Sequence, residues 1–133
     1  MAITYHSQQI LSAAILTLNS APVTLVAAQG ANKHIVPLRV IWEIEDVGTP
    51  YDTNTDINLI IDTAANYIFN YNSPILKSTV DKICATPRNF GVDNNSSQLL
   101  ANKALLCKVL SGDPLNGDGD LTVHLWYDVL TIT

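Results

Sequence analysis

Two segments of this sequence alternate between apolar and polar side chains, and this alternation constrains the fold more than any other feature. Between residues 36 and 45 the apolar positions are Val36, Leu38, Val40, Trp42 and Ile44. Between residues 121 and 129 they are Leu121, Val123, Leu125, Tyr127 and Val129. A period of two places alternate side chains on opposite faces of a β-strand. Each segment is therefore predicted to be a strand with one buried face.

Pro37 lies within the first of these strands and restricts where that strand can sit. Proline has no N–H to donate to a neighbouring strand, so within sheets it is confined to edge strands, strand starts or bulges. The sequence therefore predicts an edge position or a bulge here.

Shorter apolar runs at residues 14–18, 23–27, 56–62 and 104–110 predict further strands, because turn-forming residues separate them. The sequence does not alternate strands with helices, as a parallel α/β sheet would require. These features predict an all-β fold, an antiparallel β-sandwich or jelly roll.

One segment, around residues 78–84, is predicted to form the single short helix of this fold. Ser78 is a candidate N-cap and Asp81 follows three residues later. Val80, Ile83 and Cys84 would share one face at helical spacing.

The length of 133 residues fits one domain. We expect residues 10–133 to form a single β-sandwich domain and residues 1–9 to form an N-terminal arm. The arm, from Ala2 to Gln9, has no turn before the first strand and can reach a neighbouring subunit. No basic residue precedes an apolar run at the N-terminus, so we expect no Sec-type signal and synthesis in the cytoplasm.

Charged residues make up 14% of the chain and the net charge is −5. The usual charged share is about 25%, so a disordered acidic tail and a coiled coil are both disfavoured. The basic residues are scattered, which argues against binding to nucleic acid or to an anionic membrane. Two explanations of the low charge stay open: a polar outer face of Thr, Asn and Ser, or a surface partly buried by partners.

The sequence contains no motif of a known catalytic, nucleotide-binding or metal site. The three histidines are not spaced as a local metal pair, and Cys84 and Cys107 are expected to be reduced thiols. Glu43 and Glu45 share one face of a strand that is expected to be solvated, so they do not form an acid–base pair. We therefore expect no enzymatic activity and no cofactor.

The segment from Asn116 to Asp120 resembles part of a calcium loop, because its oxygen-bearing side chains alternate. The pattern then fails, since Leu121 stands where a calcium loop needs glycine. Gly117 and Gly119 are better interpreted as hairpin-turn residues, because glycine allows positive φ. We expect no metal here, although a cation in this loop stays open.

Trp126 falls on the outer face of the last strand beside His124, because the inner face is already filled. Ile41, Ile60 and Leu106 are also apolar residues on faces that alternation assigns to water. Tryptophan and tyrosine are enriched in interface cores, so these positions predict subunit contacts in a homo-oligomer. The alternative is that a second sheet of the same chain covers them.

Two segments resemble small virion proteins of tailed bacteriophages. Residues 16–38 are similar to an "LN-x-x-P-V" segment that leads into an "I-V-P-L" strand in those proteins. Residues 116–127 are similar to their Gly-Asp-Gly hairpin and final alternating strand. The resemblance implies a β-sandwich or jelly-roll subunit that decorates a capsid or forms a head fibre, often as a trimer. It carries over no site residues.

These observations lead to one hypothesis: a capsid decoration (cement) protein on the outside of a phage virion, made in the host cytoplasm. Its expected partners are like subunits, as a homotrimer, and the major capsid protein, with no nucleic acid or membrane. The expected contact residues are Ile41, His124 and Trp126, with Ile3 and Tyr5 of the arm. The alternative is a head- or tail-fibre module that binds a host receptor or glycan through Tyr67, Phe69 and Tyr71 or through residues 89–97.

Overall fold

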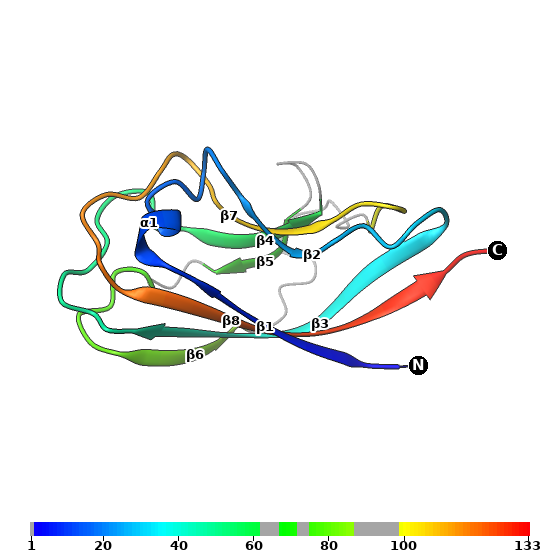
Figure 1. Ribbon diagram of the computed structural model, residues 1–133, viewed down its shortest axis with the longest axis horizontal. Coiled ribbons are helices and arrows are strands. Elements are labelled where there is room, and N and C mark those ends of the chain that lie inside the picture. The colour runs from blue at the N-terminus through cyan, green and yellow to red at the C-terminus, as the bar shows by residue number, and fades with distance from the viewer. Residues whose placement is uncertain (1, 62–66, 72–74, 87–98) are drawn as a thin grey trace.

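The computed structural model describes residues 2–61, 67–71, 75–86 and 99–133, which form two layers of antiparallel strands packed face to face (Figure 1). The first sheet contains, in spatial order, β1 (Thr4–Ile10), β8 (Asp120–Thr131), β3 (Lys33–Glu45) and β6 (Lys82–Thr86). The second contains β2 (Val23–Val26), β7 (Leu105–Val109), β4 (Ile57–Ile61) and β5 (Tyr67–Tyr71). A single turn of helix, α1 (Ser12–Ile15), lies at one end. The prediction of an all-β sandwich is confirmed.

The strands pair in a nested order. β1 pairs with β8, β2 with β7, β3 with β6 and β4 with β5, and these pairs fall alternately in the two sheets. The contacts β3–β8 and β4–β7 then complete each sheet. The chain is therefore arranged like one long antiparallel hairpin wrapped over two layers.

The core lies between the sheets and is built by the alternation noted above. Trp42 is fully buried and lies opposite Val123 on β8 and Cys84 on β6. Leu121 and Leu125 are fully buried on the same face as Val123. Both long strands predicted from their alternation are confirmed as strands, and so are the shorter ones that became β2, β4 and β7. The faces of β8 are as predicted from Leu121 to Leu125, but Asp128 is buried and Val129 only half-buried.

The register of β3 against β8 shifts between Pro37 and Arg39. The bulge predicted from Pro37 is thus confirmed. β3 as a whole lies between β8 and β6, but its described pairing with β6 covers only Val40 to Ile44. A bulge adds one residue to one strand and reverses the phase of the alternation. Val36 and Leu38, predicted to face inward, are consequently only half-buried, while Ile35 and Pro37 are buried.

The strand predicted at residues 14–18 is wrong, because this segment forms α1 and a following turn. Ile15 and Leu18 are both fully buried, three residues apart, which is helical rather than strand spacing. Alanines at positions 13 and 14 favour the helical turn.

The helix predicted around residues 78–84 is also wrong. Residues 82–86 form β6, which pairs with β3 from Val40 to Ile44. Ser78 Oγ bonds within its own turn to Val80, and Asp81 accepts the N–H of Val47 instead of starting a helix. The open edge of β3 offers this segment a full ladder of backbone hydrogen bonds, which outweighs a helical signal of a few residues.

The segment expected as an N-terminal arm lies mostly within the sheet. Residues 4–10 form β1, whose register against β8 runs without a shift from Thr4–Tyr127 to Ile10–Leu121. In the described ranges, no helix has the length and hydropathy that crossing a bilayer demands.

Candidate interaction surface on the first sheet

The first sheet turns one face to the core and the other, here called the outer face, away from it. Cross-strand pairing places Tyr5 and Arg39 on either side of Trp126, and Ile41 beside His124. On β3 and β8, Ile41 and His124 alternate with the buried residues Val40, Trp42, Val123 and Leu125, so the side chains of these five positions project from the outer face. The surface therefore gathers residues from β1, β3 and β8.

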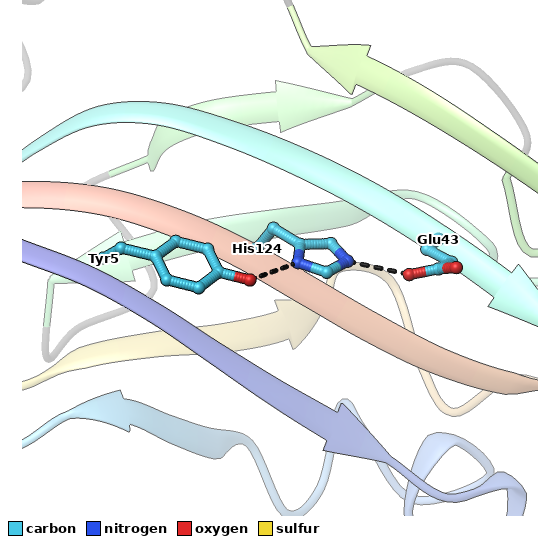
Figure 2. Close-up of polar contacts among 3 residues, drawn as sticks. All are labelled: Tyr5, Glu43 and His124. Atoms are coloured by element: carbon cyan, nitrogen blue, oxygen red, sulfur yellow. Dashed lines mark hydrogen bonds and ion pairs between the residues drawn. The ribbon is translucent and has the colours of Figure 1, made fainter.

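Tyr5, His124 and Glu43 form a chain of hydrogen bonds across three strands (Figure 2). The Tyr5 hydroxyl lies 2.8 Å from His124 Nδ1. His124 Nε2 lies 2.7 Å from Glu43 Oε2, and the two side chains are 25% and 23% exposed. The pair is thus partly shielded from water by its neighbours.

The Glu43 carboxylate, at one end of this series of hydrogen bonds, determines the direction of both hydrogen bonds. A carboxylate only accepts hydrogen bonds, so His124 Nε2–H donates to Glu43. In the neutral ring, Nδ1 then carries a lone pair and accepts the Tyr5 O–H. Each of the three groups is satisfied, and the imidazole is held in one orientation.

Two contacts of the Trp126 ring, with Tyr5 and with Arg39, extend this group of residues on the outer face. The ring centroids of Tyr5 and Trp126 are 5.0 Å apart with a 40° tilt, within the range of favourable aromatic pairs. The Arg39 guanidinium lies 5.5 Å from the Trp126 ring, at cation–π distance. We call Tyr5, Arg39, Glu43, His124 and Trp126 the outer-face array.

The pKa values of the two glutamates of β3, Glu43 and Glu45, are shifted in opposite directions. The hydrogen bond from His124, together with one from Glu45, lowers the pKa of Glu43. The hydrogen bond to Glu43 and the charge of that carboxylate raise the pKa of Glu45. The more exposed Glu45 thus holds its proton to higher pH than Glu43.

We expect Glu43→Gln to lower the free energy of unfolding at pH 7 by up to about 1 kcal/mol, the range of exposed ion pairs. A carboxyl whose folded pKa is depressed stabilises above its unfolded pKa, about 4.3, and loses that contribution as pH falls through the folded pKa. The difference from wild type should therefore shrink between pH 5 and pH 3 in urea unfolding curves.

Glu45→Gln is the matched control, because it removes a carboxyl of raised pKa from the same strand. Its stability at pH 7 should not fall. Equal losses for both variants at pH 7 would show that the His124 contact contributes nothing.

The structure brings together four of the five contact residues predicted from the sequence: Tyr5, Ile41, His124 and Trp126. The fifth, Ile3, is 59% exposed and lies just before β1, two residues from Tyr5. For Ile60 the alternative explanation holds, because it is 2% exposed within the chain itself. Arg39 and Glu43 were not predicted as members, since their partners depend on strand register.

The loop considered for calcium uses its carboxylates to hold backbone. Asp118 Oδ1 accepts the N–H groups of Gly48 and Thr49 at 2.9 and 2.7 Å. Asp120 Oδ1 accepts the N–H of Ser12 at 2.9 Å. In the part of the chain that the structure describes, no three His, Cys, Asp or Glu side chains are grouped to hold a metal. These contacts favour the turn interpretation.

The positive φ that glycine allows is not used at Gly117 or Gly119. Of the described glycines, Gly30 and Gly112 have positive φ. A Cβ on Gly117 would lie 2.2 Å from the Tyr51 ring, and a Cβ on Gly119 would lie 3.0 Å from Val47. Close packing against Tyr51 therefore requires glycine at position 117, whereas the space around Gly119 is tight.

The alternative binding surface cannot be assembled from described side chains. Residues 67–71 form β5, an edge strand paired with β4, and the side chains of Tyr67, Phe69 and Tyr71 lie outside the described set. Residues 89–97 also lie outside the described residues.

No protein-family model and no curated protein matches the sequence. Solved phage capsids contain similar chains. One from the cyanophage Pam1 capsid asymmetric unit is 16% identical with a TM-score of 0.46, over 95% of this chain and 82% of that one. One from the capsid of Ralstonia phage GP4 is 16% identical with a TM-score of 0.47, over 99% and 86%. One from the acidic stable capsid of Helicobacter pylori bacteriophage KHP30 is 14% identical with a TM-score of 0.41, over 99% and 95%. Similarity at this level does not assign a function.

Proposed function

We propose that this chain is a structural virion protein of a tailed phage, a capsid decoration (cement) protein without enzymatic activity. It binds the major capsid protein on the outside of the shell as a homo-oligomer, a trimer by the resemblance of its sequence. The outer face of the first sheet makes the contact with the shell.

The observation that carries this proposal is the outer-face array. Tyrosine, tryptophan and arginine are the residue types enriched in binding hot spots, and here Trp126 contacts both Tyr5 and Arg39 on one sheet face. Trp126 is held by neighbours on both sides, so little side-chain freedom remains to be lost on binding. Ile41, beside His124, adds apolar surface to the same face.

The resemblance to phage virion proteins rests on segments that have structural roles in this fold. Asn19 and Ser20 donate their backbone N–H groups to Asp113, each at 2.9 Å. These hydrogen bonds lower the pKa of the Asp113 carboxyl. The nested strand pairing is the one that a jelly roll requires, which supports the subunit type that the resemblance implies.

The mechanism requires no chemistry. A protein that binds the assembled shell, and not its separated subunits, stabilises assembly by mass action. The gain is about 2.7 kcal/mol per site when the free protein is at a hundred times its Kd. A low share of charged residues is suited to a subunit with much of its surface in contacts.

The test is co-sedimentation with shells assembled from the major capsid protein of the phage that encodes this chain. Trp126→Ala should weaken binding by roughly 10- to 30-fold, the effect of losing a hot-spot residue. Thr24→Ala, an exposed position on the second sheet, is the control and should bind like wild type.

Wild-type binding by Trp126→Ala would contradict the assignment of the outer face. Failure of the wild-type protein to bind any such shell would contradict the decoration role, and a glycan array would then test the fibre alternative. Deletion of residues 2–9 is a less selective experiment, because it also removes most of the β1 ladder on β8.

A further inference from the structure

Strand β1 forms one edge of the first sheet, and only one of its sides is paired. β8 occupies that side along all seven residues. Among the described residues no strand pairs with the other side. An edge of this kind presents unpaired N–H and C=O groups at alternate residues and is a template for another strand.

The usual protections of an edge strand are missing from β1. Its sequence, Thr-Tyr-His-Ser-Gln-Gln-Ile, contains no charged residue other than a titratable histidine and no proline, and its register has no bulge. β1 is also the longest of the four edge strands, since β2 has 4 residues and β5 and β6 have 5 each. β6 begins with Lys82, whose charge disfavours pairing.

Three of the exposed large hydrophobic side chains lie along this one segment. Ile3 is 59% exposed, Tyr5 is 52% exposed and Leu11 is 56% exposed. Leu11 continues the extended backbone past β1, with φ −68° and ψ 156°. All three residues have odd numbers. Since successive side chains of a strand point to opposite faces, all three lie on the outer face.

We propose that β1 pairs antiparallel with β1 of a second copy of this chain, in the register that sets Ser7 opposite Ser7. Ser7 is midway between Ile3 and Leu11. This register therefore places Ile3 of each copy opposite Leu11 of the other, so both exposed aliphatic side chains find a partner twice.

The charge distribution supports a second copy as the occupant. Each chain has a net charge of −5, so most contacts between copies would bring like charges together. β1 has no acidic residue, and the proposed register places Tyr5 opposite Gln9 without opposing charges. A register shifted to centre on His6 would leave Ile3 and Leu11 without each other.

The contact is isologous and joins copies in pairs. A two-fold contact of this kind is distinct from the contacts within a trimer. It can link two neighbouring trimers, and it does not depend on trimer formation or on binding to a shell. The second copy adds a strand to the sheet and extends the outer-face array across the two-fold axis.

Engineered disulfides test the register. Directly opposed residues on antiparallel strands have Cα atoms about 4.5–5.5 Å apart, which suits a disulfide. Ser7→Cys should therefore form a covalent dimer under mild oxidation. In the same register the two copies of residue 9 are offset by four positions, roughly 13 Å, so Gln9→Cys should stay monomeric on a non-reducing gel.

Cross-linking of Gln9→Cys as readily as Ser7→Cys would overturn the register. Wild type, with Cys84 and Cys107, sets the background. A monomeric Ser7→Cys variant that still binds shells would overturn this inference and leave the decoration role intact.

A charge exchange provides a second test that needs no oxidation. Ser7→Lys places two lysines opposite each other and should weaken dimerisation by up to ~5-fold in sedimentation equilibrium. Mixing S7K with S7E should restore association, while Thr24→Lys on β2 should have no effect. Unchanged dimerisation of S7K, or no recovery on mixing, would contradict the pairing.

Discussion

Gly117→Ala is expected to destabilise the protein by about 3 kcal/mol, the upper part of the range for overpacked cores. The added Cβ would lie 2.2 Å from Cγ and Cδ1 of Tyr51, far inside the 3.5–4.0 Å of ordinary carbon contacts. In a chain of this length, that loss lowers the melting temperature by roughly 10 °C.

Tyr51 cannot move aside to make room. It is 2% exposed, and its hydroxyl donates a 2.7 Å hydrogen bond to the carbonyl of Gly119. The ring is therefore fixed at its tip by the loop that the substitution would disturb. Burial and the nearby carboxylates of Asp120 and Asp118 raise the pKa of the hydroxyl, so the hydrogen bond persists across the accessible pH range.

The double variant with Tyr51→Ala identifies the cause. Without the ring, Gly117→Ala should add little further loss, so the two effects will be strongly non-additive. Thermal melts of the four proteins in this cycle measure the coupling. If Gly117→Ala costs the same in both backgrounds, the close approach to Tyr51 is not the reason for glycine.

Trp42→Ala is expected to cost about 3–5 kcal/mol, as for large core aromatic residues. Trp42 is fully buried between β8 and β6, and its removal leaves a cavity that the paired strands cannot close. Against a total stability of about 5–15 kcal/mol, a loss of this size removes a large share of the free energy of unfolding.

The chain contains two tryptophans, and the second is the matched control. Trp126 lies on the outer face and is only half-buried, so Trp126→Ala should cost under about 1 kcal/mol while weakening binding to the shell. Urea unfolding followed by circular dichroism measures the loss of stability in the Trp42→Ala and Trp126→Ala variants. Similar losses for the two variants would contradict the assignment of opposite faces.

The difference between Trp42 and Trp126 was predictable, because alternation alone assigns faces in a regular strand. The same rule failed at Val36 and Leu38, where the bulge after Pro37 shifts the phase. Proline indicated that a bulge was possible, yet the residue at which the phase changes depends on pairing with β8. Local pattern cannot supply that information.

Two of the segments predicted wrongly, residues 82–86 and 4–10, have structures that depend on distant partners, whereas the error at residues 14–18 is local. Residues 82–86 become a strand because β3 is available beside them, and residues 4–10 join β8 at the far end of the chain. The outer-face array has the same origin. Tyr5 and His124 are 119 positions apart, and only the register of β1 on β8 brings them within hydrogen-bonding distance.

Gly117 shows a second limit of prediction from the sequence alone. Its place in a glycine-rich turn suggested backbone freedom, which is the common reason for glycine in turns. The actual reason is the ring of Tyr51, a residue that lies between β3 and β4 and is distant from Gly117 in the sequence.

The nested pairing of strands also determines when the fold can be completed. β8 lies between β1 and β3, so the first sheet cannot be completed until β8, the last of the eight described strands, has been synthesised. Most of its contacts join residues far apart in sequence, and proteins of this kind typically fold in milliseconds to seconds rather than microseconds. During synthesis β1 is unpaired until β8 is made. An uncharged, unpaired strand can pair with strands of other chains. Slow folding therefore lengthens the time during which β1 is exposed to such pairing.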